Sequence, residues 1–335
     1  EHIEETGIDT SEFWQNLYYQ SPPASYEQTR SSNPVDMLTS GIFASHWVNT
    51  VSPSFLEEIT QRQHLAIPSQ VCDELLNKQN AGFASGITNA PDSSYNPSSD
   101  DALTCPFTAD NHADAKLINK RSFQKQMGLV ADDTAPLLFW PSRLDPIQKG
   151  PELLTDILAK LIAKHRQCGM QIAFVADGSH GHHIRQIISM ENLAGMVSIK
   201  PFDENLSRLG YAASDFMLMP SKFEPCGLTQ MIALKYGSLP IVHRTGGLKD
   251  TIEHLNTINS TGNGFVFDDY ISDALDWAIQ CAIDFHQLPP AVKQREMERV
   301  MQQAHSRFTH QKTASHYINL YEEMLGKPLH AKDPT

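Results

Sequence analysis

The sequence has few cysteines and no spacing that would let them act together. Its five cysteines are scattered along 335 residues, and no CxxC pair occurs. Isolated cysteines in an odd number predict neither a disulfide framework nor a zinc site, and they favour a reducing compartment. The fifteen histidines show no ligand spacing. Their densest group, His180, His182 and His183, fits a solvated glycine-rich loop better than a metal site. We therefore expect no metal and no cofactor.

Positive charge and long apolar runs are also scarce. The chain carries 26 Lys and Arg against 39 Asp and Glu, a formal net charge of −13. Such a balance disfavours nucleic acid as a partner, although a nucleotide in a locally basic pocket remains compatible. No apolar run reaches the roughly 20 residues that a membrane-spanning helix needs. Neither nucleic acid nor a membrane is therefore an expected partner.

What the sequence has is a regular alternation of strand-like and helix-like segments. Strands are predicted at 135–144, 170–176, 196–201, 215–220 and 239–243, and helices at 151–168, 182–190, 203–212 and 226–236, with another from 247 and two more within 290–325. This alternation predicts an α/β fold with a doubly wound parallel sheet. The chain is also long enough for two domains with sizeable cores.

The opening third is less regular. It predicts a short helix over 12–19, a loop over 21–34 and a strand over 44–51. Ser52 or Ser54 then caps a further helix. The turn-rich stretch over 86–101 follows, and we place the main domain boundary near its end, after residue 98.

A carboxylate is predicted at the carboxyl edge of a strand. Glu224 lies between the strand over 215–220 and the helix over 226–236. Ligands of open α/β sheets bind at that edge, and the N–H groups of a helix start attract an anion such as a diphosphate. A turn glutamate without a ligand is the alternative. Because Thr245 to Asp250 follows the next strand, a second such junction lies beside the first and favours a ligand site.

Two cations are predicted at the same edge. Arg143 and Lys149 share the loop that follows the strand over 135–144. Fixed there, they would neutralise a diphosphate leaving group in place of a metal ion. Solvated surface charges are the commoner fate of Arg and Lys, so the pair alone is a weak signal. Together with the helix start beside Glu224, it indicates a site for a phosphate-bearing ligand.

The motifs in these loops resemble those of one enzyme family. Lys-Phe-Glu-Pro-Cys-Gly-Leu-Thr-Gln over 222–230 is similar to a segment of the bacterial glycogen synthase and plant starch synthase family. Less specific matches are Leu-Pro-Ile-Val-His-Arg-Thr-Gly-Gly-Leu-Lys-Asp-Thr over 239–251, Ser-Arg-Leu…Gln-Lys-Gly over 142–150, Asn-Thr-Val-Ser-Pro-Ser-Phe over 49–55 and Gly-Ile-Thr-Asn…Asp over 86–92. All of these matches occur in the order that the family has.

The resemblance implies a retaining glycosyltransferase of the GT-B type, built from two Rossmann-like domains. It implies transfer of glucose, with retention, from a nucleotide-glucose donor to the non-reducing end of an α-1,4-glucan. ADP-glucose is the favoured donor and UDP-glucose the alternative. The products of such enzymes are glycogen and starch. A bacterial cytoplasm is the favoured location, with the plastid stroma as the alternative.

The resemblance also assigns roles by matched position. Arg143 and Lys149 would hold the donor phosphates, and Glu224 would stabilise positive charge at the anomeric carbon of the glucose. Four residues would line the glucose and offer helix N–H groups to the diphosphate: Cys226, Gly227, Leu228 and Thr229. Asn89 would reach the sugar, and Phe202 stands where the family usually has a Tyr that stacks on the base.

These assignments are chemically coherent without a metal. Breaking the glycosyl–phosphate bond builds negative charge on the diphosphate, which Arg143, Lys149 and the helix start would stabilise. It also builds positive charge on the sugar, which an ionised Glu224 would stabilise. Cys226 is expected to fill space rather than to act as a nucleophile, because no His lies close in sequence to activate it.

Three positions depart from the family pattern. The loop has one residue more between Arg143 and Lys149 than the commonest form, Lys222 stands where Arg is usual, and Ala90-Pro91 replaces the Gly that usually follows the Asn. A Gly there would suit a positive φ that Ala tolerates poorly. We interpret these changes as marks of a divergent branch rather than of lost function.

The family's amino-terminal half is not represented, and the chain begins with Glu1 rather than Met. We therefore expect a piece in which 1–98 is the tail of the amino-terminal, acceptor-side domain, 99–306 the nucleotide-sugar-binding domain, and 307–335 a helix that packs back toward the first domain. Such a piece is expected to be inactive or weakly active alone. The alternatives are another retaining GT-B glycosyltransferase and a non-catalytic regulatory protein that binds nucleotide or glucan.

Overall fold

The structure, a computed structural model, describes residues 14–21 and 32–329. The chain divides into two compact units, Glu1–Gly86 and Ile87–Thr335, and each is described by itself. The predicted boundary after residue 98 lies a little further along the chain, and the three predicted domains stay a prediction. The helix over 12–19 and the loop over 21–34 fall partly outside the described residues.

The first unit is a small α/β arrangement. Its elements are α4 (Met37–Ala44), β1 (Val48–Thr50), α5 (Pro53–Thr60), α6 (Ser69–Asn80) and β2 (Ala84–Gly86). The two strands pair in parallel, and their helices share a core of Ile42, Leu56, Ile59, Val71, Cys72 and Leu75. Ser52 rather than Ser54 caps α5, because the Ser52 hydroxyl accepts from the Phe55 N–H at 2.9 Å. The first unit thus has a parallel pair of strands covered by helices, and its assignment to the tail of an amino-terminal domain stays a prediction.

The second unit contains the predicted doubly wound sheet. Its strands are β3 (Leu137–Trp140), β4 (Gln171–Val175), β5 (Val197–Lys200), β6 (Phe216–Met219), β7 (Leu239–His243) and β8 (Phe265–Phe267). They are all parallel and lie in the order β5-β4-β3-β6-β7-β8. The four residues of β3 are fully buried, as expected for a central strand that is covered on both faces.

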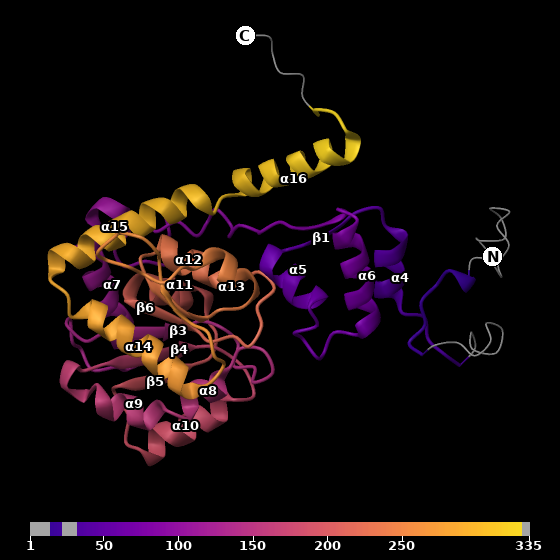
Figure 1. Cartoon of the computed structure of the whole chain (residues 1–335). Helices are drawn as coiled ribbons and strands as arrows, with labels where there is room; N and C mark the ends of the chain where they lie inside the picture. Colours follow the sequence, from indigo (N-terminus) through magenta and orange to yellow (C-terminus); the bar gives the residue numbers. More distant parts are fainter. Residues whose placement is uncertain (1–13, 22–31, 330–335) are drawn as a thin grey trace, which may run out of the picture. The chain divides into compact units, whose positions relative to one another are not determined.

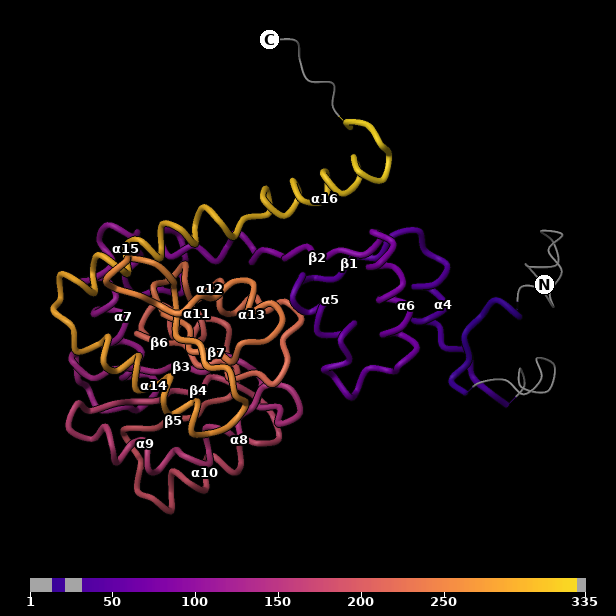
Figure 2. The backbone as a smooth tube through the Cα atoms, viewed as in Figure 1, coloured from indigo at the N-terminus to yellow at the C-terminus, as the bar shows by residue number. Residues whose placement is uncertain are grey.

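Helices cover both faces of this sheet (Figure 1). The helices of this unit are α7 (His112–Met127), α8 (Pro151–Thr155), α9 (Leu158–Lys164), α10 (Gly181–Met190), α11 (Glu204–Ala213), α12 (Thr229–Lys235), α13 (Gly246–Thr251), α14 (Ser272–His286), α15 (Pro290–Arg307) and α16 (His310–Leu325), with 3-10 turns at Ala109–Asn111 and Arg166–Cys168. In the backbone trace, α7, α11 and α12 lie on one side of the strands, and α8, α9, α10 and α14 lie on the other (Figure 2). Two helices, α15 and α16, fill the region where the sequence predicted two.

Prolines shorten the first strand of the sheet. The sequence predicted a strand over 135–144, but β3 spans only Leu137–Trp140. Pro136 and Pro141 flank it, and proline has no N–H to donate to a neighbouring strand. Neither proline can donate to a neighbouring strand, although the Pro136 oxygen still accepts from the Gln171 N–H at 2.9 Å. The residues after Pro141 form a loop at the carboxyl edge of the sheet.

The predicted helix over 151–168 is interrupted. It consists of α8, α9 and a 3-10 turn, with a break at Asp156 and Ile157. The hydroxyl of Thr155 donates to the backbone oxygens of Pro151 at 3.2 Å and Glu152 at 3.1 Å. Such bonds from a Thr side chain to its own helix bend it, and the break follows directly. None of the helices in the described part of the chain combines the length and the apolarity that a membrane crossing requires.

Candidate functional site

The predicted site lies where the order of strands reverses. From β3 the chain continues to β4 and β5 on one side, and then returns to β6, β7 and β8 on the other. The loops that follow β3 and β6 therefore leave the sheet side by side and diverge. Ligands of open α/β sheets bind in the crevice at such a switch point. The loop after β3 carries Arg143 and Lys149, and the loop after β6 carries Glu224.

Backbone hydrogen bonds join the loops that follow β3, β6 and β7. The Lys222 N–H donates to the Gln148 oxygen, and the Gly247 N–H donates to the Glu224 oxygen, both at 2.8 Å. The approach is too close for side chains: a Cβ at Gly247 would lie 1.9 Å from the Cys226 oxygen. A Cβ at Gly150 would lie 2.3 Å from the Pro220 oxygen. Glycine is therefore required at both positions, and the loops are held at a fixed spacing.

Lys149 and Glu224 form an ion pair across two of the loops. The Lys149 Nζ lies 2.6 Å from the Glu224 Oε2. The side chains are only 12% and 8% exposed. Ser221, at the end of β6, donates its hydroxyl to the same carboxylate oxygen at 3.2 Å. The sequence placed these two residues at one edge of the sheet, and the structure brings their charged atoms into direct contact.

Arg143 occupies a more open position in the same loop. Its side chain is exposed, and its Nη2 donates to the Gln148 Oε1 at 3.2 Å. A guanidinium carries five N–H donors in a planar fork, so this bond leaves most of them for a ligand. Gln148 thus holds Arg143 with its side chain and Lys222 with its backbone oxygen. Sequence reasoning assigned no role to Gln148.

The turn that leads into α12 is held by a buried glutamine. The Gln230 amide donates to the oxygens of Cys226 at 3.1 Å and Gly227 at 2.9 Å, and to the Thr251 hydroxyl at 3.1 Å. Gly227 has a φ of 70°, a conformation outside the right-handed helix. For that reason α12 begins at Thr229 and not at the predicted Cys226. The position of Gln230 at the end of the Glu-Pro-Cys-Gly-Leu-Thr-Gln run was the only signal of its role.

Cys226 and Asn89 are neighbours in the structure. Burial raises the pKa of the Cys226 thiol, and a hydrogen bond with the Asn89 backbone partly opposes that rise. The nearby Glu224 carboxylate raises the pKa further. The thiol therefore stays protonated, which agrees with a space-filling rather than a nucleophilic residue. The Asn89 side chain itself is exposed.

The remaining predicted residues lie farther out along the same edge. Leu228 is 40% exposed and Thr229 is half-buried at the start of α12. Phe202 follows β5, the outer strand beyond β4, and its ring is largely open because the residue is 52% exposed. The Phe202 N–H donates to the Asp177 Oδ1 at 3.3 Å, which fixes its backbone beside the loop after β4.

His243 contacts Ser221, the residue that bonds to Glu224, and Tyr270 packs against His243. Sequence reasoning missed both His243 and Tyr270. The His243 Nδ1 lies 2.9 Å from the Ser221 oxygen, and its ring packs edge-on against Tyr270. The Tyr270 hydroxyl donates to the Glu152 Oε1 at 2.9 Å. The signal for His243 was a polar residue at the end of an otherwise apolar strand.

The histidine-rich segment is largely helical. The helix predicted over 182–190 is α10, and His182 and His183 lie in its first turn, so the loop suggested for the three histidines is wrong for these two. The His180 Nε2 lies 3.0 Å from the Thr155 hydroxyl. Across residues 14–21 and 32–329, no group of three or more His, Cys, Asp or Glu side chains is arranged to hold a metal ion.

Comparisons with known proteins place this geometry in context. The model of the family described as glycosyl transferases group 1 matches residues 123–298, just over half of the chain. The glycogen synthase of Rhodospirillum rubrum is 38% identical over 299 residues, which are 88% of this chain and 58% of that protein. The glycogen synthase of Geobacillus thermodenitrificans is 33% identical over the same share of both.

A solved structure is similar over most of the chain. It is described as the catalytic domain of Starch Synthase IV from Arabidopsis thaliana bound to ADP and acarbose. The TM-score is 0.75 and the identity 28%, over 92% of this chain and 63% of that one. Sucrose-phosphate synthase from Thermosynechococcus elongatus shares the fold, with a TM-score of 0.57 at 20% identity. The chain thus spans less than two thirds of the length of these relatives.

Proposed function

Since the chain belongs to the family of glycosyl transferases group 1, we propose that it forms the donor half of a glycogen or starch synthase. The reaction is glucosyl transfer, with retention, from ADP-glucose to the non-reducing end of an α-1,4-glucan. Similarity to two glycogen synthases over 88% of the chain supports this reaction. ADP is the nucleotide in the similar starch synthase structure, and it is the donor nucleotide that we propose here.

The observation that carries the proposal is the contact between Lys149 and Glu224 at the switch point. Transfer breaks the bond between the anomeric carbon and the phosphate oxygen, so negative charge grows on the diphosphate and positive charge grows on the sugar. A largely buried ammonium and carboxylate 2.6 Å apart offer one charge to each side of that bond. In a crevice with little water, such fixed charges stabilise a transition state more strongly than in solution.

The other predicted residues then have defined places around the donor. Arg143 adds an exposed fork of donors next to Lys149 and binds the diphosphate. Cys226, Gly227, Leu228 and Thr229 form the turn and the first residues of α12, and they border the glucose. Phe202 stacks on the base. Asn89 contacts the sugar from the segment that leads into the second unit.

The acceptor side of the proposal rests on the relatives alone. The chain spans 58% of the length of the two glycogen synthases. We propose that residues 1–98 belong to the acceptor-side domain, that residues 99–306 bind the nucleotide sugar, and that the helix within 307–335 contacts the first domain. A bacterial cytoplasm is the proposed location. The alternative proposal, a non-catalytic nucleotide-binding protein, predicts donor binding without transfer.

Calorimetric titration of the chain with ADP, UDP and ADP-glucose tests the proposal. We expect ADP to bind more tightly than UDP. We also expect Arg143→Ala to weaken ADP by roughly tenfold, as the loss of a charge-assisted contact does. Arg166→Ala is the matched control, because Arg166 is an exposed residue in the 3-10 turn that precedes β4, at the opposite edge of the sheet, and it should leave the affinity unchanged.

Two outcomes would decide against parts of the proposal. A folded chain that binds no nucleotide would reject the assignment of the donor site. Equal loss of affinity in Arg143→Ala and Arg166→Ala would show that ADP binds through general charge rather than at this edge. Glucose transfer to maltoheptaose, measured as released ADP with the full-length protein, separates the enzyme from the non-catalytic alternative.

A further inference from the structure

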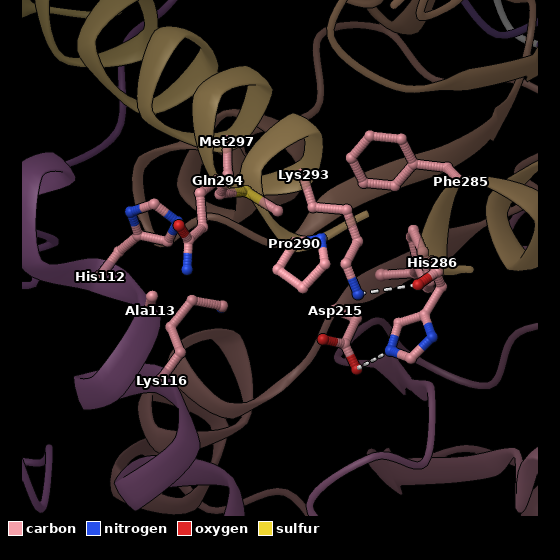
Figure 3. A pocket seen from close by; sticks show the side chains of 11 residues that line it. His112, Ala113, Lys116, Asp215, Phe285, His286, Pro290, Lys293, Gln294 and Met297 are labelled. Carbon is pink, nitrogen blue, oxygen red and sulfur yellow. Dashed lines mark hydrogen bonds and ion pairs between the residues drawn. The ribbon is translucent and has the colours of Figure 1, made fainter. Parts of the chain in front are cut away.

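A second pocket lies at the opposite edge of the same sheet. It is bordered by α7, by the start of β6, by the end of α14 and by the start of α15 (Figure 3). Its lining residues are His112, Ala113, Lys116, Asp215, Phe216, Phe285, His286, Pro290, Lys293, Gln294 and Met297. Its volume is about 220 Å³, below the roughly 300–1,000 Å³ of pockets for drug-sized ligands. An occupant is therefore a small molecule.

One side of this pocket is apolar. Phe216 begins β6, Phe285 ends α14, and Met297 lies on α15; all three are buried in the fold. Pro290 adds a ring at the start of α15. Because these side chains already expose little surface, the gain comes mainly from the occupant's own apolar body leaving water, at roughly 25 cal/mol for each Å² covered.

The other side offers unused hydrogen-bond donors. The Lys293 Nζ donates once, to the His286 oxygen at 2.8 Å, and an ammonium has three N–H donors. The His112 Nδ1 donates to the Ala109 oxygen at 2.7 Å, and burial lowers the pKa of the ring, so its second nitrogen is an acceptor and adds no donor. In the described part of the chain, the Gln294 amide has no hydrogen-bond partner. Figure 3 shows Lys293 and Gln294 extending from α15 toward α7 and Asp215.

The charge next to this pocket is positive and incompletely balanced. The Lys116 Nζ is buried and donates to the oxygens of Ala212, Ser214 and Tyr236 at 2.9–3.0 Å. Among the described residues, no carboxylate lies within ion-pair distance of it. The nearest negative charge, Asp215, is already paired with Lys120 at 2.9 Å. Burial lowers the pKa of Lys116 to about 7, which Asp215 opposes and Lys120 assists.

We propose that this pocket binds a small organic anion, with one carboxylate or phosphate group on an apolar body. The anion accepts hydrogen bonds from Lys293 and Gln294, and it supplies the counter-charge that the buried Lys116 lacks. Its body rests on Phe216, Phe285 and Met297. The proposal concerns a site separate from the proposed donor site, because β6 begins at the pocket and ends at the loop that carries Glu224.

Titration calorimetry with benzoate, phenyl phosphate and benzyl alcohol tests this site on the 335-residue chain. Phosphates also suit the proposed donor site, so each titration is performed with ADP at saturation. We expect one of the two anions to bind and benzyl alcohol, which has the body without the charge, not to bind. The anion that binds identifies the head group as carboxylate or phosphate.

Substitutions then locate the binding. Lys293→Met should weaken the bound anion at least tenfold, and Gln294→Ala, at an exposed position that tolerates change, should weaken it several-fold. Lys160→Met, at an exposed position on α9, is the matched control and should have no effect. Binding of neither anion would overturn the proposal. An affinity that stays within twofold in both Lys293→Met and Gln294→Ala would also overturn it, whatever the donor site does.

Discussion

The two ends of β6 each carry a lysine–carboxylate pair, and the two pairs are built differently. At the amino end, Asp215 contacts Lys120 at 2.9 Å and also accepts from the Leu137 N–H at 2.9 Å. The Asp215 carboxylate accepts from the Leu137 N–H in place of a backbone oxygen, and it thereby joins β3 to β6. At the carboxyl end, the Glu224 carboxylate contacts the side chains of Lys149 and Ser221, which lie in loops. The first pair joins two strands of the sheet, whereas the second joins two loops at the proposed donor site.

The difference shows how one strand serves two purposes. A carboxylate that is satisfied by backbone groups cannot leave them without exposing unpaired N–H donors, so Asp215 is fixed. A carboxylate that is satisfied by side chains can exchange partners when a ligand enters. The predictions below test whether stability and ligand binding separate in this way.

The largest expected effect is on stability at the amino end. Asp215→Asn leaves the Lys120 ammonium buried without its counter-charge, and removing one partner of such a pair costs about 3 kcal/mol of unfolding free energy. Urea denaturation followed by circular dichroism measures it. Asp133→Asn is the matched control, because its pair with Arg121 is exposed, and it should leave the midpoint unchanged. ADP affinity of the folded Asp215→Asn variant should match the wild type; a large loss would mean that the two ends are not separate.

The opposite effect is expected at the carboxyl end. Lys149→Ala should weaken ADP binding by roughly 100-fold, or about 2.7 kcal/mol, because a charge-assisted contact to phosphate is lost. The unfolding midpoint should change far less than in Asp215→Asn. Lys222→Ala, an exposed lysine on the neighbouring loop, is the control for calorimetry. If Lys149→Ala destabilised the fold as much as Asp215→Asn, the carboxyl-end pair would be a structural one too.

The decrease in the free energy of unfolding at acidic pH should depend on the pair between Asp215 and Lys120. Burial raises the pKa of Asp215, but Lys120, His286 and the Leu137 N–H outweigh it and lower the pKa to about 2. A carboxyl whose pKa is lowered in the folded state stabilises the fold above the unfolded pKa, near 4, and loses that contribution as pH falls toward 2.

The measurement is the unfolding free energy of the wild type and of Asp215→Asn at pH 5, 4 and 3. The gap between the two should narrow as pH falls, by up to about 2 kcal/mol, since each unit of pKa shift is worth about 1.4 kcal/mol. A gap that stays constant down to pH 3 would contradict the assigned role of Asp215.

The smallest expected effect is that of a substitution at Glu224, and it distinguishes most clearly between the two lysine–carboxylate pairs. Glu224→Gln removes the carboxylate that competes with phosphate for Lys149, so ADP should bind a few-fold more tightly than to the wild type. Stability should change little, because the glutamine still accepts from Ser221. Calorimetry with ADP measures the first and thermal unfolding the second. Weaker ADP binding in Glu224→Gln would show that Glu224 positions Lys149 rather than competes for it.

Much of the second unit follows from local sequence. Buried strands separated by amphipathic helices predicted the parallel sheet, and β7 matches its predicted bounds, Leu239–His243. The errors lie where single residues act: Pro136 and Pro141 shorten β3, and Thr155 interrupts a long helix. Those effects depend on backbone hydrogen bonds that hydrophobic periodicity does not encode.

The proximity of Lys149 and Glu224 was predictable from the sequence, but their contacts were not. The rule that loops meet at one edge of a parallel sheet brought Lys149 and Glu224 together. It gave no sign that their charged atoms touch, or that Gln230 and His243 hold the turns around them. Such contacts join residues that are distant in sequence, so they appear only when the loops are placed in space.

The glycines at 150 and 247 constrain how this protein could be re-engineered. At both glycines the backbones of neighbouring loops are in direct contact. No larger residue fits there, so substitution at these positions cannot widen or narrow the crevice. Altered nucleotide preference must instead come from residues whose side chains are open and whose backbones are already held. Phe202, anchored through its N–H to Asp177, is the first position to randomise.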